Sequence, residues 1–343
     1  MGLFAGFSLY HASFGFTSAW RRFHSEARGA GLRWQILLIL LVALVSYPLI
    51  SPDGLWGVKA GGFVFPFGVA AALGAFVFGI GMQFGGGCAS GTLFTAGGGS
   101  VRMMITLVFF VAGSLLATAH SEIWGNWPRL PAVSLVREFG AVGAYGILLA
   151  LLGGVFLFSR WWEKRRHGVL EQDSTTPTLV RGPWPKSWGV VALAVVSLAT
   201  LLILSRPWGI TSGFALWGAK IAAGLGVEVQ NWAYWKGQRG ALENSLFTHS
   251  TSVMNFGIMA GALFAASLAG KFAPTLRIAP REILTAVLGG LLMGYGARLA
   301  YGCNIGAYLG GLVSGSLHGW GWLLFGFLGS VTGDRLKRGL LQA

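Results

Sequence analysis

Long runs of apolar residues, separated by short polar or charged segments, recur along the whole chain. A bilayer core about 30 Å thick needs roughly 20 apolar residues per helix. Eight segments meet this requirement, and they cover residues 34–50, 65–84, 101–120, 139–159, 188–204, 249–269, 281–301 and 316–331. Residues 2–20 are a shorter ninth candidate that glycine interrupts. The pattern therefore predicts an all-α integral membrane protein with about nine transmembrane helices.

The composition agrees with a lipid environment. Of the 343 residues, 54% are hydrophobic and 10% are charged, whereas soluble globular chains carry about 25% charged residues. Glycine occurs 55 times and has no collagen-like period. Glycine within apolar segments favours close packing of helices and breaks inside them. The two cysteines are too few for a disulfide framework.

The formal net charge of +14 has two interpretations, nucleic-acid binding and membrane topology. The lysines and arginines lie between apolar segments, which favours the second interpretation, so we expect a lipid bilayer and no nucleic acid as partner. With nine spans and an outside N-terminus, about two thirds of these residues fall on inside segments. The positive-inside rule therefore predicts an outside N-terminus and a cytoplasmic C-terminus. The opposite orientation is the alternative.

An internal repeat contains both cysteines of the chain. Residues 73–91 match residues 288–306 at seven positions without a gap, so one constant offset relates the two segments. The matching positions end in Gly87-Cys88-x-x-Gly91 and Gly302-Cys303-x-x-Gly306. Because glycine is common in this chain, the cysteine match is the specific part of the repeat.

A second, weaker pair of motifs extends the repeat. The run Gly-Phe-Thr-Ser at residues 15–18 resembles Gly-Ile-Thr-Ser at residues 209–212. Each half then has four spans, and the span at 139–159 lies between them. One extra crossing turns the second half over, which predicts two inverted repeats, a recurrent transporter architecture. We expect a first repeat over residues 1–138 with breaks at 15–18 and 85–97. Residues 139–187 are the connecting span and a cytoplasmic linker (163–186), and residues 188–343 are the inverted repeat with breaks at 209–225 and 302–311.

The segments after the two cysteines are too short to span a bilayer, so they are expected to be re-entrant half-helices lining a cavity. Each cysteine then lies at a helix N-terminus, where free N–H groups and the helix dipole attract anions. Neutral S–H groups can donate weak hydrogen bonds to such an anion, whereas a thiolate would repel it. The alternative for each thiol is a small, inert core side chain.

The predicted pathway residues come from the four breaks. They are Thr17, Ser18, Gly87, Cys88, Ser90, Gly91, Thr211, Ser212, Gly302, Cys303, Asn304 and Gly306. The Thr-Ser pairs have helix capping as their alternative role. Arg298 and Lys220 are further candidates because ionisable groups at membrane depth are often functional, although both side chains can also reach the interface. No histidine has metal-ligand spacing, so the sequence predicts no metal, cofactor or catalytic residue.

At the breaks 15–18, 81–91 and 296–306 the chain resembles the YeeE/YedE family of sulfur-compound transporters. The resemblance implies a bacterial inner-membrane protein that imports thiosulfate through an hourglass of nine spans and short re-entrant helices. It also implies that thiosulfate passes between cysteines through transient S–H···S contacts, with Cys88 and Cys303 as two stations. Many relatives have a further cysteine in the first break, where this chain has Thr17 and Ser18. A small TusA-like sulfur carrier in the cytosol is the implied partner.

Three functions compete at this stage. The first is uptake of thiosulfate, with selenium compounds or other sulfur species as alternative substrates. The second is a membrane sulfurtransferase that forms a cysteine persulfide, which the absence of an obvious general base near the cysteines disfavours. The third is a structural protein in which the glycine motifs serve helix packing alone.

Overall fold

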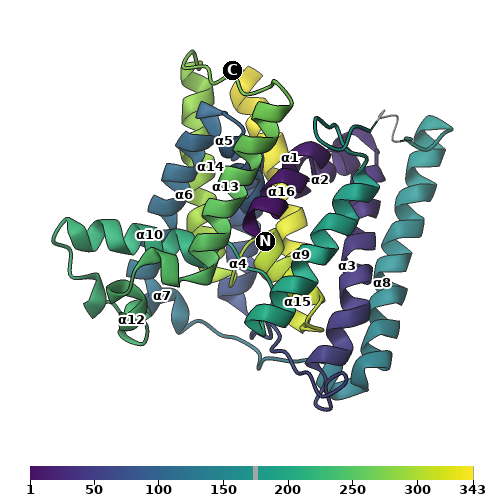
Figure 1. The fold of residues 1–343 in the computed structure, drawn as a ribbon, viewed down its shortest axis with the longest axis horizontal. Coiled ribbons are helices and arrows are strands. Elements are labelled where there is room, and N and C mark those ends of the chain that lie inside the picture. Colours follow the sequence, from purple (N-terminus) through teal and green to yellow (C-terminus); the bar gives the residue numbers. More distant parts are fainter. Residues whose placement is uncertain (173–176, 343) are drawn as a thin grey trace.

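The computed structural model describes residues 1–172 and 177–342, and these residues form helices and connecting loops without a β-strand. Figure 1 shows long helices side by side, with shorter helices between them. Seven helical segments in the described part of the chain are long and apolar enough to cross a membrane. They are Ala30–Ile50, Val69–Gly97, Val101–Ala119, Leu135–His167, Lys186–Leu204, Ser250–Leu268 and Pro280–Leu312. The predicted all-helical, multi-pass membrane architecture is therefore confirmed.

The helix order follows the predicted apolar segments closely. The first part contains α3 (Ala30–Ile50), α4 (Val69–Gly85), α5 (Ala89–Gly97), α6 (Val101–Ala119), α7 (Ser121–Gly125) and α8 (Leu135–His167). The second part contains α9 (Lys186–Leu204), α10 (Thr211–Gly224), α13 (Ser250–Leu268), α14 (Pro280–Leu299) and α16 (Leu317–Gln342). α16 is long enough to cross a bilayer, but its histidine, tryptophans and glycines lower its mean hydropathy, and it is not among the seven segments.

The N-terminal segment consists of two short helices. Residues 2–20 do not form one helix, because the chain breaks between α1 (Gly2–Ala12) and α2 (Phe16–Glu26). Ser13 ends α1 in the left-handed conformation at φ 45°. α2 is amphipathic: its first turn buries Phe16, while Arg21 and Glu26 are exposed. With 11 residues, α1 is shorter than a full membrane span.

Glycine determines how α4 and α14 pack. A Cβ atom added to Gly74 would lie 2.7 Å from the carbonyl oxygen of Gly296, and one added to Gly296 would lie 2.5 Å from that of Gly74. Gly81 and Gly289 make the same reciprocal contact, at 2.9 and 2.8 Å. Any side chain at these positions would overlap the neighbouring backbone, so glycine lets the two helices approach closely. The offset that relates Cys88 to Cys303 also relates the first of these contacts to the second.

The other long helices also pack in pairs that the repeat relates to each other. α4 packs along α16 while α14 packs along α6, and α3 packs along α9 while α13 packs along α1. A Cβ atom on Gly79 of α4 would meet the Gly326 carbonyl of α16 at 2.3 Å. One on Gly294 of α14 would meet the Phe110 carbonyl of α6, also at 2.3 Å. Matching positions of the repeat therefore make matching contacts.

α8 lies at one edge of the molecule, beside α3 (Figure 1). Near its C-terminal end, the buried Glu163 carboxylate pairs with Arg33 at 2.7 Å and Arg28 at 3.3 Å. The same carboxylate accepts hydrogen bonds from the backbone N–H groups of Gly29 and Glu171. These ion pairs and hydrogen bonds connect the end of α8 to the start of α3. The predicted linker 163–186 therefore begins later than expected, since α8 continues to His167, and its residues 173–176 lie outside the described residues.

The connection after α10 has no counterpart in the first half. Residues 27–29 are enough to join α2 to α3, whereas residues 225–249, named here the α10–α13 segment, join α10 to α13. The segment contains η1 (Val229–Asn231), α11 (Ala233–Lys236), α12 (Arg239–Glu243) and η2 (Leu246–Thr248). Trp235 is buried against α10, and its indole N–H donates to Thr118 Oγ1 at 3.2 Å. In Figure 1 this segment lies on the opposite side from α8.

Candidate functional site at the two cysteine breaks

Both cysteines occupy the position just before a short helix. Cys88 precedes α5, and Cys303 precedes the π-helical segment η3 (Asn304–Leu309), which continues into α15 (Gly310–Leu312). Gly86 and Tyr301, at equivalent positions of the repeat, are both left-handed, with φ 86° and 60°. The conformation costs glycine little and strains tyrosine. The two breaks therefore have a similar backbone path despite different side chains.

Glycines flank both cysteines at equivalent positions. A Cβ atom on Gly87 would lie 3.2 Å from Gly91, and one on Gly302 would lie 3.1 Å from Ala307. The glycine before each cysteine thus lets the chain pass close to the first turn of the following helix. A Cβ atom on Gly306 would lie 3.8 Å from the Cα atom of Gly209. This contact brings the second cysteine break against the second Gly-x-Thr-Ser break.

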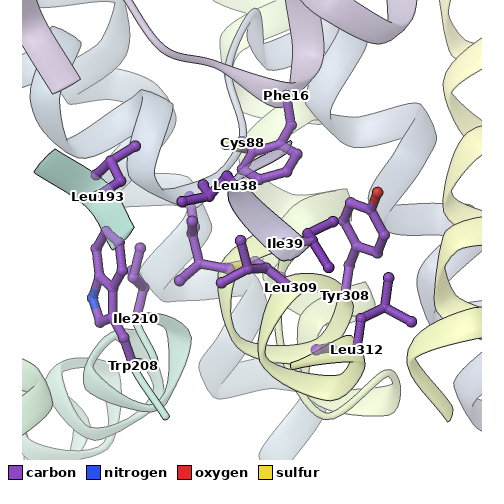
Figure 2. Packing of buried hydrophobic residues seen from close by; sticks show 14 of the residues in the cluster. Phe16, Leu38, Ile39, Cys88, Leu193, Trp208, Ile210, Tyr308, Leu309 and Leu312 are labelled. Atoms are coloured by element: carbon purple, nitrogen blue, oxygen red, sulfur yellow. The ribbon is translucent and has the colours of Figure 1, made fainter. Parts of the chain in front are cut away.

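The two thiols lie in one buried cluster. Cys88 and Cys303 are both 0% exposed and belong to the same buried hydrophobic cluster, and α5 contacts η3. Figure 2 shows Cys88 within this cluster together with Phe16 of α2 and Leu38 of α3. The breaks that the sequence pairs are therefore neighbours in the fold, and both thiols are shielded from solvent.

The Gly-x-Thr-Ser breaks become the starts of α2 and α10. Thr17 and Thr211 are buried, whereas Ser18 and Ser212 are exposed. Thr211 Oγ1 accepts a hydrogen bond from Arg298, while Thr17 Oγ1 is buried without a partner. Neither serine caps its helix, since the N-terminus of neither α2 nor α10 has a side-chain capping hydrogen bond. Within the range 209–225, where the sequence predicts a break, the 14 residues of α10 form a helix that begins at Thr211.

Arg298 and Lys220, both sequence candidates, have different surroundings. Arg298 is 8% exposed, and its guanidinium donates to Thr211 Oγ1 at 2.5 Å and to the Tyr234 hydroxyl at 3.1 Å. Lys220 Nζ donates to the backbone carbonyls of Leu242 and Asn244. Lys220 therefore anchors the α10–α13 segment, whereas Arg298 lies beside the second pair of breaks.

Several buried polar atoms around the breaks have no hydrogen-bond partner. Both side-chain amide atoms of Asn304 are in this position, together with Thr17 Oγ1 and Arg298 Nε. Ser90 Oγ is satisfied, since it lies 3.3 Å from Cys88 Sγ. Unpartnered buried groups are uncommon in native proteins and require an explanation such as a ligand. Those at the breaks leave hydrogen-bonding groups free for a polar ligand.

Sequence reasoning missed Gln83. This residue is 3% exposed, and its amide donates to the Thr17 carbonyl at 3.3 Å and to Ser330 Oγ at 2.7 Å. The signal for it was available, because Gln83 is the repeat equivalent of Arg298, as Cys88 is of Cys303. Within residues 1–172 and 177–342, by contrast, no group of three or more His, Cys, Asp and Glu side chains is placed to hold a metal ion.

Two cavities reach the Gly-x-Thr-Ser breaks from opposite ends of α9. The first, about 360 Å³, touches Gly15, Ser18 and Lys186, the last of which starts α9. The second, about 380 Å³, touches Gly209 and Leu204, the last residue of α9. Because α9 has 19 residues, about 28 Å separates its ends. Each cavity also carries arginine side chains: Arg22, Arg28 and Arg33 in the first and Arg206 in the second.

The chain is similar in sequence to several proteins that are named transporters. The probable transporter YedE from Salmonella typhimurium is 33% identical over 152 residues, which make up 44% of this chain and 37% of YedE. The thiosulfate transporter TsuA from Spirochaeta thermophila is 28% identical over 276 residues, 77% of this chain and 76% of TsuA. TsuA from Escherichia coli is 24% identical over 351 residues, 98% of this chain and 92% of that protein.

This chain therefore spans little more than a third of the YedE relatives that it matches and most of the two TsuA proteins. The model of the family described as sulphur transport matches residues 11–332. With a match over nearly its whole length and seven helical segments that can cross a membrane, the chain belongs to the sulphur transport family of multi-pass membrane proteins, the YeeE/YedE transporters.

Proposed function

We propose that this protein carries thiosulfate, or a closely related small sulfur anion, across the bacterial inner membrane. The observation that carries the proposal is the placement of Cys88 and Cys303, each at the start of a short buried helix, on helices that contact each other. The likeness to TsuA, named a thiosulfate transporter, supports this substrate. Selenium compounds and other sulfur species are the alternatives that substrate competition distinguishes.

The chemistry of the breaks suits such an anion. Free backbone N–H groups and the positive end of the helix dipole attract negative charge at a helix start. Neutral thiols add S–H donors that can contact the sulfur or oxygen atoms of thiosulfate. Ser90, Asn304, Thr17 and the flanking glycines complete the pathway in this proposal. A thiolate would repel a divalent anion, so both thiols stay protonated during passage.

The passage narrows at the thiols and widens on both sides, like an hourglass. The two cavities beside Gly15 and Gly209 are its vestibules. Phe16 and Ile210, at equivalent positions of the two Gly-x-Thr-Ser breaks, are buried in the same cluster as the thiols (Figure 2). Because both thiols are inaccessible to solvent, the described conformation is closed, and side chains around the breaks move aside when an anion passes.

The topology that we propose is a pair of inverted repeats, residues 1–138 and 188–343, joined by residues 139–187. The reciprocal glycine contacts of α4 and α14, and the matching pairs of long helices, support it. Counting α16 and the N-terminal segment 2–20, which α1 forms together with the start of α2, with the seven apolar segments gives nine crossings. α5 and η3 are then re-entrant helices that meet in the middle of the bilayer.

The orientation follows from charge, with the N-terminus in the periplasm and the C-terminus in the cytosol. The end of α8 and the start of α3, joined through Glu163, carry Arg28, Arg33 and Lys164 on one face of the protein. The positive-inside rule assigns this face to the cytosol. A small TusA-like sulfur carrier could receive the imported sulfur there and is the partner that we propose.

The protein is proposed to be a transporter rather than a sulfurtransferase. The relatives are named transporters, and Ser90, the polar side chain within reach of the Cys88 thiol, is no base. Exposure to thiosulfate followed by mass spectrometry of the intact protein separates the two functions. A stable persulfide on either cysteine would favour the enzyme.

The decisive experiment is uptake of labelled thiosulfate into proteoliposomes, with sulfate and selenite as competitors. We expect uptake by the wild-type protein and its loss in Cys88→Ala and Cys303→Ala. Growth on thiosulfate of cells without other sulfate and thiosulfate importers gives an independent readout, with membrane levels of each variant as control. Normal uptake by both cysteine variants would contradict the proposed pathway.

A further inference from the structure

Gln83 and Arg298 occupy equivalent positions and make equivalent contacts. Each lies five residues before its cysteine, so the offset that relates Cys88 to Cys303 also relates Gln83 to Arg298. The Gln83 amide donates to the backbone of Thr17, and the Arg298 guanidinium donates to the side chain of Thr211. Each therefore connects the helix before a cysteine break to the threonine of the neighbouring Gly-x-Thr-Ser break.

The two side chains differ in charge. Arg298 donates to two neutral hydroxyl groups, those of Thr211 and Tyr234, and its buried Nε has no partner. Within the described residues, no carboxylate lies within ion-pair distance of its guanidinium. A buried charge without a counter-ion is costly, so an anion next to Arg298 would be favoured.

The surroundings of Gln83 carry charges of both signs. Its side chain is neutral, and Lys337 Nζ donates to its backbone carbonyl at 2.9 Å. Asp334 and Glu282 act on Lys337 together with Arg102 and Arg21, so both signs of charge are present on that side. Of the two equivalent positions, only that of Arg298 therefore carries a buried charge with no carboxylate within ion-pair distance among the described residues.

The α10–α13 segment holds Arg298 in place. The Tyr234 hydroxyl accepts from the guanidinium, and the neighbouring Trp235 is buried and bonded to Thr118 on α6. This segment has no counterpart between α2 and α3. The half of the repeat that contains the buried Arg298 is thus also the half with the additional supporting segment.

We propose that Arg298 is an anion-binding residue on the periplasmic side of the cysteines, and that Gln83 is its neutral counterpart on the cytosolic side. A dianion entering from the periplasm is held by a charge, and one leaving to the cytosol meets an amide that holds it weakly. The asymmetry does not change the equilibrium distribution of a passive solute. It lowers the anion concentration that half-saturates transport from the periplasmic face. This inference rests on the proposed transport function.

The test compares transport from the two faces. Right-side-out and inside-out membrane vesicles are given labelled thiosulfate, and half-saturation is measured for the wild type and for Arg298→Gln, which makes the two positions alike. The wild type should saturate at a lower concentration from the periplasmic face. Loss of one charge-assisted contact should raise that concentration roughly tenfold in Arg298→Gln and leave the value from the cytosolic face nearly unchanged. Arg298→Lys should give an intermediate value.

Two further variants separate binding from folding. Tyr234→Phe removes a hydrogen bond from Arg298 and keeps the charge, so half-saturation should change less than in Arg298→Gln. Gln83→Arg should lower half-saturation from the cytosolic face. Thermal unfolding in detergent identifies any variant that has lost its fold. For each folded variant, the ratio of half-saturation from the two faces then tests the charge asymmetry.

The outcomes distinguish the inference from the proposed function. If the wild type carries no thiosulfate from either face, the transport function fails. If the wild type transports and its half-saturation is equal from both faces, or Arg298→Gln changes both faces by the same factor, the charge asymmetry fails and the transport function stands.

Discussion

Gly81 and Gly289 face each other so closely that neither can carry a side chain: a Cβ atom on either would lie within 2.9 Å of the other's carbonyl oxygen. A Cβ atom on Gly289 would also lie 2.2 Å from the backbone nitrogen of Gly85. Because backbone atoms cannot move aside as a flexible side chain can, these positions determine the spacing between α4 and α14. The cysteine breaks follow directly from the ends of these two helices.

Gly289→Ala should therefore destabilise the protein by at least the 1–3 kcal/mol that is typical of overpacking. Thermal unfolding of the purified protein in detergent measures the effect. Gly146→Ala is the matched control, since Gly146 lies on α8 with nothing within 4 Å of an added Cβ atom. That variant should be as stable as the wild type or slightly more stable. Equal unfolding temperatures for both variants would disprove the close contact.

Asn304 should affect stability and transport in opposite directions. Its amide is fully buried without a partner, and an unsatisfied buried polar group costs about 1–3 kcal/mol. Asn304→Ala, which introduces the residue present at the equivalent Ala89, should unfold at the same or a higher temperature and take up thiosulfate more slowly. A less stable variant with normal uptake would assign the amide a structural role.

Glu163 should be the most important carboxylate for the stability of the α3–α8 contact. It is buried and pairs with Arg33 and Arg28, so Glu163→Ala leaves two arginines without a counter-ion at a cost of about 3–5 kcal/mol. Glu26→Ala, which breaks the exposed pair with Arg22, should cost less than about 1 kcal/mol. Unfolding of both variants in SDS titrations checks this ranking, and a reversed order would contradict it.

His249 should make stability depend on pH. Its Nδ1 accepts the backbone N–H of Ser252 at the start of α13, which a protonated ring cannot do. Burial, with a smaller contribution from Arg206, holds the pKa of His249 below its ordinary value of 6.5. The unfolded chain therefore binds the proton first, and stability falls as the pH decreases from about 6.5.

The matched variant for this prediction is His249→Asn, because asparagine caps a helix without titrating. The difference in unfolding temperature between wild type and variant should be constant above pH 7 and should shift against the wild type in acid. A constant difference down to pH 5 would show that His249 has no part in the pH response. Comparing the two proteins cancels the titration of the other histidines.

The apolar pattern was sufficient to locate the long helices, since α3, α4, α6 and α14 begin and end within a few residues of the predicted segments. Lipid exposure imposes the same requirement for apolar residues on each of them. The repeat of Gly-Cys-x-x-Gly was likewise sufficient to identify the two breaks as a pair, because a tight turn before a short helix needs glycine at fixed positions.

Other features depend on tertiary contacts that the pattern does not contain. Residues 2–20 are apolar enough for a span, yet Ser13 turns the chain so that α2 can bury Phe16 and Trp20. The α10–α13 segment is held by single contacts, such as those of Trp235 and Lys220, that have no periodicity. Gln83 escaped attention because a neutral amide in an apolar run is inconspicuous until its equivalence to Arg298 is noticed.

The glycine contacts between α4 and α14, and those of their partners α16 and α6, limit how this protein can move. Helices whose backbones already touch cannot slide or rock past each other without steric overlap, so we expect these four to behave as a stiff frame. The proposed pathway should then open through small displacements of the short helices α5 and η3, which lie between these four helices, and of the aromatic rings beside them. A protein of this kind would work as a narrow gated pore rather than by alternating rigid-body motions of two domains.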